Sequence, residues 1–161
     1  MQYLTMDKFL WCIKKNAFEI VVPNENLSKA YLIKAKDALV AASADISREW
    51  QISAAYYSMY FSLYSILMKT GIKCENHSCT LAFVGRLLEK YFSTNDIEFL
   101  NESLKARIDA QYYVNRKVTD KQYKEMLKQA PQILVKCKSI VEQLTEDEIS
   151  SIRNKIHKMI R

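Results

Sequence analysis

The feature that most constrains this chain is a run of 19 residues without a charged side chain, from Trp50 to Met68. A helix of this length is long enough to span the apolar core of a bilayer. The run also contains four serines, four tyrosines and a glutamine, which make it less apolar than membrane-spanning helices. A helix that is apolar on nearly every face but carries hydroxyl groups is typical of an element surrounded by protein. We therefore predict a buried central helix and no contact with a membrane.

Glycine and proline, which mark most tight turns, are rare in this sequence. Only two of each occur among 161 residues, whereas hairpins and sheets need such residues at their turns. The sequence thus predicts an all-α fold, namely an antiparallel up-and-down bundle of four to five helices with an additional helix at each end. Because no repeat or linker divides the chain, we expect a single domain over residues 1–161 with its core at about 27–141.

Apolar periodicity and capping residues place the individual helices. The additional terminal helices are expected at about residues 6–20 and 146–160, and a second helix from Asn26 or Ser28 to about Ala44. Ser47 is a suitable N-cap for the central helix, which should end at Gly71. The other helices are expected to begin at Asn76 or Ser78, at Thr94 or Asn95, and at Thr119.

Two expectations concern the direction of side chains near the ends of helices. Tyr112 continues the apolar stripe of the fifth helix and is therefore expected to point inward. The last helix has isoleucines along one side, so we expect its basic residues to face outward. These residues are Arg153, Lys155, Lys158 and Arg161.

The four cysteines show no pattern that is typical of a metal site. Cys12, Cys74, Cys79 and Cys137 include no CxxC pair, and Cys74 and Cys79 lack a second pair of ligands. We expect reduced thiols, no metal and no cofactor. No signal peptide is visible at the N-terminus, which favours a cytoplasmic location. The net charge of +6 permits an anionic partner, but its scattered lysines favour an ordinary solvated surface.

One polar cluster could carry a function, since no motif of a known hydrolase, nucleotide-binding loop or metalloenzyme is present. An arginine beside phenols and an acid can hold a phosphate while a ring stacks on a base. The alternative, favoured by the residues alone, is structural: Asp109 or a neighbouring glutamate pairs with Arg107, and the tyrosines pack in the bundle. The candidate binding residues are Arg107, Asp109, Gln111, Tyr112, Tyr113 and Arg116.

The order of several segments resembles the HEPN domain (higher eukaryotes and prokaryotes nucleotide-binding), in particular its small archaeal and bacterial branch. Residues 55–61 read AYYSMYF, Gly71 is followed by an Asn76-His77 pair, and residues 107–112 read RIDAQY, where the branch has R-x-x-A-D-Y. The resemblance covers about residues 27–141. It implies a helical bundle, commonly a homodimer, and in many members a pairing with a minimal nucleotidyltransferase. It also makes His77 a secondary candidate.

Many HEPN proteins are metal-independent ribonucleases that use an arginine followed, after four to six residues, by a histidine. The corresponding positions after Arg107 hold Tyr112, Tyr113 and Val114, none of which is histidine. Arg153 and His157 are one residue too close together, and they lie outside the family's motif helix. We therefore assign no catalytic residue and lean against an enzyme.

The prediction is a non-catalytic HEPN-like protein that binds a nucleotide, RNA or a minimal nucleotidyltransferase partner through the face of Arg107. A first alternative is a HEPN-type ribonuclease toxin with a non-standard active site that combines Arg107 with Tyr112 or Tyr113. A second alternative is a structural module for dimerisation or for linking other proteins. Phenols titrate near pH 10, so tyrosine is a poor proton shuttle at neutral pH, which disfavours the ribonuclease.

Overall fold

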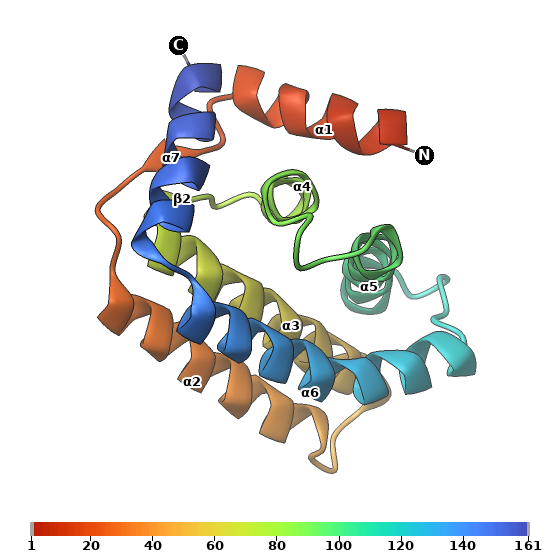
Figure 1. Ribbon diagram of the computed structural model, residues 1–161. Helices are drawn as coiled ribbons and strands as arrows, with labels where there is room; N and C mark the ends of the chain where they lie inside the picture. The colour runs from red at the N-terminus through yellow and green to blue at the C-terminus, as the bar shows by residue number, and fades with distance from the viewer. Residues whose placement is uncertain (1, 161) are drawn as a thin grey trace.

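A computed structural model describes the backbone of residues 2–160 and the side chains of residues 8–160. Over this range the chain is an all-α helical bundle, as predicted, with one two-stranded sheet that the sequence did not predict (Figure 1). The elements are α1 (Gln2–Lys14), β1 (Glu19–Ile20), α2 (Glu25–Ala42), α3 (Arg48–Thr70), β2 (Ile72–Lys73), α4 (His77–Leu87), α5 (Thr94–Tyr112), α6 (Asp120–Gln143) and α7 (Glu146–Ile160).

The predicted central helix is α3, which contacts α2, α4, α5, α6 and α7. In Figure 1, α2, α3 and α6 run along one diagonal of the molecule, whereas α4 and α5 are seen end-on. Ile52, Met59 and Leu63 of α3 are fully buried, and burial of a side chain of this size stabilises a fold by about 1.5–3 kcal/mol.

The prediction of a buried helix is wrong for its first residue, because Trp50 is 61% exposed. Trp50 lies in the first turn of α3, next to the connection from α2. The membrane reading of this stretch receives no support. Within residues 2–160, no helix combines the length and the apolar character that crossing a bilayer requires.

The end of α3 is held by an arginine from the other end of the chain. Gly71 ends the helix in the left-handed conformation (φ 69°), as predicted. Nη1 of Arg153 in α7 lies 2.6 Å from the carbonyl oxygen of Val21, 3.1 Å from that of Thr70 and 2.9 Å from that of Gly71. The prediction that Arg153 faces outward is therefore wrong, whereas Lys155 and Lys158 are exposed. Arg161 lies outside the described residues.

The first helix ends earlier than predicted. It ends at Lys14 rather than near Ile20, because Asn16 adopts a left-handed conformation (φ 51°) that closes the last turn. The chain then becomes extended, and β1 pairs antiparallel with β2 in the register Glu19 to Lys73 and Ile20 to Ile72. Pairing between two segments that are far apart in the sequence thus replaces the helix that the local pattern predicted for residues 19 and 20.

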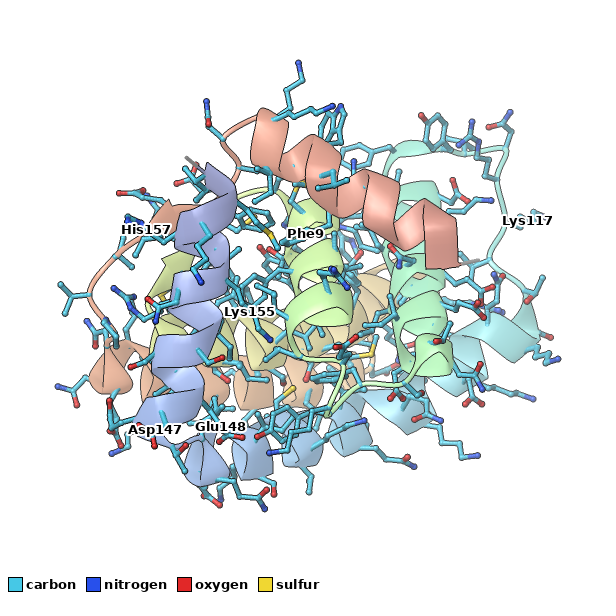
Figure 2. All side chains as sticks on the ribbon, turned by 45° about the horizontal axis from the view of Figure 1, so that its top comes forward. Phe9, Lys117, Asp147, Glu148, Lys155 and His157 are labelled. Atoms are coloured by element: carbon cyan, nitrogen blue, oxygen red, sulfur yellow. A yellow bond between two sulfur atoms is a disulfide. The ribbon has the colours of Figure 1, made fainter. Side chains whose placement is uncertain are left out.

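A disulfide joins α1 to α4, so the prediction of reduced thiols is wrong for two of the four cysteines. Cys12 and Cys79 are bonded across 67 positions of the sequence, whereas Cys74 and Cys137 are free and buried. Phe9, on the same helix as Cys12, is also buried in the interior (Figure 2). Among the side chains that the structure describes, no group of three histidine, cysteine or acidic residues could hold a metal ion.

Candidate functional site

The centre of the candidate site is Arg107, a half-buried residue in the last third of α5. Its Nη2 donates a hydrogen bond of 2.6 Å to the hydroxyl oxygen of Tyr57 in α3. The guanidinium carbon lies 5.1 Å from the ring centroid of Tyr57 and 5.7 Å from that of Tyr112. Arg107 therefore contacts two tyrosine rings from two helices.

The charge of Arg107 has no carboxylate partner. Within the described part of the chain, no acidic side chain forms a salt bridge with it, and its buried Nε has no hydrogen-bond partner. The predicted pairing with Asp109 is wrong, because the Asp109 carboxylate instead accepts a 3.1 Å hydrogen bond from Nη1 of Arg116. Helical spacing explains this outcome, since residues two positions apart point to different sides of a helix.

The local sequence fixes where α5 presents these side chains. Ser93 and Asp96 form a capping box at its start, an arrangement that satisfies two otherwise unpaired backbone donors. Ile97, Leu100 and Ala106 are buried and hold α5 against the bundle. This fixes the rotation of the helix, so that Arg107 is directed toward α3.

The tyrosines at the end of α5 are exposed, contrary to the prediction that Tyr112 points inward. Tyr112 is 67% exposed and Tyr113 is 41% exposed, because α5 ends at Tyr112 and the chain leaves the bundle there. The ring of Tyr113 is covered by the guanidinium of Arg116, whose central carbon lies 3.7 Å from the ring centroid. Tyr112 thus offers a free aromatic face beside Arg107.

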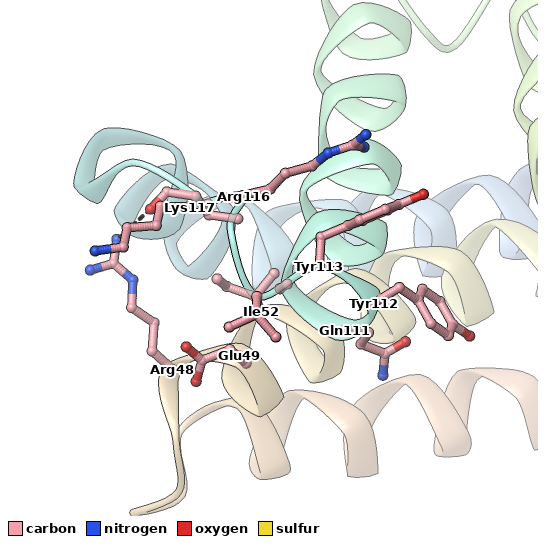
Figure 3. A pocket seen from close by; sticks show the side chains of 11 residues that line it. Arg48, Glu49, Ile52, Gln111, Tyr112, Tyr113, Arg116 and Lys117 are labelled. Carbon is pink, nitrogen blue, oxygen red and sulfur yellow. Dashed lines mark hydrogen bonds between the residues drawn. The ribbon is translucent and has the colours of Figure 1, made fainter.

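A hollow of about 420 Å³ lies between the first turn of α3 and the connection from α5 to α6. Arg48 and Lys117 lie on one side of it and the two tyrosines on the other, with Glu49 as the acidic side chain in the lining (Figure 3). The guanidinium of Arg48 donates hydrogen bonds to the carboxylate of Asp120 and to the carbonyl oxygen of Val118. Four of the predicted site residues line this hollow: Gln111, Tyr112, Tyr113 and Arg116.

His77, the secondary candidate, begins α4 and faces the tyrosines of α3. The preceding Asn76 caps α4 by accepting a hydrogen bond from the backbone of Cys79. Nδ1 of His77 lies 2.8 Å from the hydroxyl oxygen of Tyr56, and the imidazole stacks on Tyr60 at 4.0 Å between centroids. His77 is therefore bound to the central helix rather than only within α4.

The protonation of His77 follows from its surroundings. Burial lowers the pKa of His77, and the positive charge of Arg107 lowers it further, so the imidazole is neutral at pH 7. Burial raises the pKa of the Tyr56 phenol, which therefore keeps its proton. The 2.8 Å contact is the only hydrogen bond of the Tyr56 hydroxyl among the described residues, and the imidazole tautomer decides which of the two groups donates. With the proton on Nε2, the Tyr56 hydroxyl donates to Nδ1 and His77 presents a donor on Nε2.

Sequence reasoning missed the contribution of α3 to this site. Tyr56, Tyr57 and Tyr60 were assigned to the core, yet they connect His77 to Arg107. Their hydroxyl groups in a charge-free helix were the available indication, because a buried phenol needs a polar partner. The arginine and histidine that are close in sequence are not assembled: Arg153 binds backbone carbonyls, and His157 is exposed on α7 (Figure 2).

The fold and the site define a helical bundle with an uncompensated arginine among tyrosines of a central helix. The family model of the HEPN domain matches residues 28–140, which run from the first turn of α2 to the last turn of α6. This chain belongs to the HEPN domain family, as the resemblance predicted. A search of curated proteins gives no significant match. Membership of the family indicates a function related to nucleotides or RNA.

Proposed function

We propose that this protein binds RNA or a nucleotide through Arg107 without cleaving it. The observation that carries the proposal is the half-buried guanidinium of Arg107, which has one phenol partner and no carboxylate among the described residues. A charge removed from water without a counter-charge is unfavourable. A phosphate supplies both the opposite charge and the acceptor oxygens that a guanidinium binds best.

The surroundings of Arg107 support a nucleic-acid ligand rather than a simple anion. The exposed ring of Tyr112 lies beside the guanidinium, and stacking of a base on such a ring contributes about 1–3 kcal/mol. Arg48, Arg116 and Lys117 surround the adjoining hollow, and positive side chains attract the phosphates of neighbouring nucleotides.

The hydrogen bonds of His77 support binding over cleavage. Cleavage of RNA by a metal-independent ribonuclease needs a base that removes the proton of the 2′-hydroxyl. We assign the donor role in the 2.8 Å contact to the Tyr56 hydroxyl, and its hydrogen bond to Nδ1 leaves the imidazole proton on Nε2 and neither nitrogen free to act as that base. In this proposal Nε2 of His77 donates a hydrogen bond to a phosphate oxygen.

The proposal is tested by the affinity of the protein for a fluorescently labelled single-stranded oligoribonucleotide at low salt, measured by anisotropy. Arg107→Met is expected to weaken binding at least tenfold, equivalent to about 1.4 kcal/mol. Arg86→Met is the matched control, because Arg86 is exposed on α4 and its loss removes the same charge elsewhere. Equal losses in both variants, or no binding by the wild type, would refute a specific site at Arg107.

The ribonuclease alternative is tested with the same protein. Single-stranded RNA is incubated in a chelator, and cleavage is followed on a denaturing gel. We expect intact RNA. Cleavage by the wild type that is lost in both Arg107→Met and His77→Gln would replace the binding proposal with a ribonuclease.

HEPN domains commonly dimerise, and we propose that this chain forms a homodimer as well. Light scattering coupled to size-exclusion chromatography measures the mass directly, and a monomer at micromolar concentration would refute the proposal. The predicted minimal nucleotidyltransferase partner stays a prediction, for which the product of the neighbouring gene is the first candidate to test by co-purification.

A further inference from the structure

A second hollow lies beside the Arg107 site and differs from the first in its chemistry. It is an apolar groove of about 320 Å³ between α2 and the first half of α3. Small side chains of both helices, including Ala41 and Ala54, line it, and the 61%-exposed indole of Trp50 forms part of its wall. Ligand sites in proteins are typically apolar hollows of this size with a few polar groups.

The groove shares one residue with the Arg107 site and one with the hollow beside it. Tyr57 lines the groove, and its hydroxyl group accepts the hydrogen bond from Arg107. Gln111 lines both the groove and the hollow of about 420 Å³. Tyr57 is thus the residue through which a ligand held at Arg107 would meet the groove.

One buried polar group of the groove lacks a partner among the described residues. The hydroxyl oxygen of Ser53 is buried without a hydrogen bond, and the residue is only 3% exposed. An unpaired buried polar group is unfavourable, so a ligand with a polar edge would be favoured here over a purely apolar one.

We propose that the groove binds the base of the nucleotide whose phosphate Arg107 holds. A nucleobase is flat, has apolar faces that suit the apolar wall formed by Trp50 and Tyr57, and has a polar edge that can pair with the buried hydroxyl of Ser53. Since a base inside a duplex cannot enter a groove, the ligand class is single-stranded RNA or a free nucleotide. This inference rests on the proposed function and adds to it the position of the base.

The test uses Trp50 as a reporter in the full-length protein. The chain has two tryptophans, so Trp11→Phe leaves Trp50 as the sole one. Saturable quenching of its fluorescence by adenosine 5′-monophosphate is expected, because a stacked base quenches an indole. Ribose 5-phosphate, which has the phosphate but no base, is expected to bind in calorimetry without quenching.

A substitution that fills the groove distinguishes binding of the base from binding of the phosphate. Ala41→Leu places a larger side chain in the groove at an exposed helical position and should weaken adenosine 5′-monophosphate at least tenfold while leaving ribose 5-phosphate unchanged. Ala30→Leu is the matched control, because Ala30 is exposed on the same helix outside the groove. Arg107→Met should weaken both ligands.

The outcomes distinguish the two proposals. If neither ligand binds, the proposed function fails and the base site fails with it. If adenosine 5′-monophosphate binds in an Arg107-dependent manner but neither quenches Trp50 nor responds to Ala41→Leu, the base site is wrong and the phosphate site stands. A change of oligomeric state in Ala41→Leu with unchanged nucleotide affinity would also overturn the base site and assign the groove to a contact between proteins.

Discussion

Arg153 and Arg107 are both half-buried arginines that reach α3 from another helix, yet their surroundings are opposite. Arg153 lies at the carboxyl end of α3, where three backbone carbonyl oxygens surround its Nη1. Arg107 lies beside the first half of the helix, where a single phenol accepts its hydrogen bond and Nε has no partner. The carbonyls satisfy one guanidinium within the fold, whereas the other keeps its capacity to bind an anion.

This difference separates a structural role from a binding role for the same residue type. The carboxyl end of a helix carries partial negative charge, so Arg153 stabilises the end of α3 without a carboxylate. Among the described residues, no carboxylate does this for Arg107. Removing the first arginine should therefore affect mainly stability, and removing the second should affect mainly binding.

The largest expected effect is at Gly71, where the Arg153 region is most tightly packed. A Cβ at Gly71 would overlap Nη1 of Arg153 and the carbonyl oxygen of Val21, and the backbone is left-handed. Gly71→Ala should lower the free energy of unfolding by about 3 kcal/mol, measured by urea denaturation.

Gly85→Ala is the control for this prediction. Gly85 lies within α4, and its Cβ would meet Ile97 no closer than 3.4 Å. The change should leave stability unchanged or raise it by up to about 1 kcal/mol, because alanine favours a helix. Equal effects of the two substitutions would show that the end of α3 is not specially constrained.

The next effect compares the two arginines directly. Arg153→Met should lower the free energy of unfolding by about 2 kcal/mol, because three carbonyl oxygens lose a charged donor. Arg107→Met should leave it unchanged or raise it by up to about 1 kcal/mol, because an uncompensated charge is removed. Urea denaturation of both variants measures the difference. A larger loss of stability in Arg107→Met than in Arg153→Met would reverse the assignment of roles.

The smallest expected effect is a dependence of stability on pH that originates at His77, near Arg107. Because the pKa of His77 is held below its ordinary 6.5, the unfolded chain takes up a proton at His77 before the folded chain does. The contribution of His77 to stability is thus fully present above pH 6.5 and is lost as the pH falls through the lower folded pKa.

Unfolding free energies at pH 7.5 and 5.5 measure this dependence, and His77→Gln should reduce the difference between the two values. The exposed His157 on α7 supplies the control, since His157→Gln should leave the difference as it is in the wild type. If His77→Gln also leaves it unchanged, the lowered pKa of His77 in the folded protein is wrong.

Local patterns were sufficient for most of the fold. Gly71 ends α3, and Asn76, Ser93 and Thr119 cap the following helices near the predicted positions. Capping chemistry and apolar periodicity act within a few residues, so they can be read from the sequence. The predictions were wrong where an element depends on residues that are distant in the sequence. An example is α1, which ends early at Lys14.

For the candidate site, the sequence identified residues on α5 but not which of them contact one another. It selected Arg107, Gln111 and the tyrosines, but it assigned Asp109 to the wrong arginine and placed Tyr112 inside. A short segment reveals which residue types are near one another. It does not reveal which of them the rest of the fold leaves without a partner.

By itself, the sequence determined that this protein is a helical bundle around a charge-free central helix, and that it resembles the HEPN family. Tertiary structure alone decided that Cys12 meets Cys79, that Arg153 rather than Arg107 is satisfied, and that Trp50 lines an apolar groove. The physical reason is that helix formation depends on neighbouring residues, whereas the pairing of charges and thiols depends on which helices pack together.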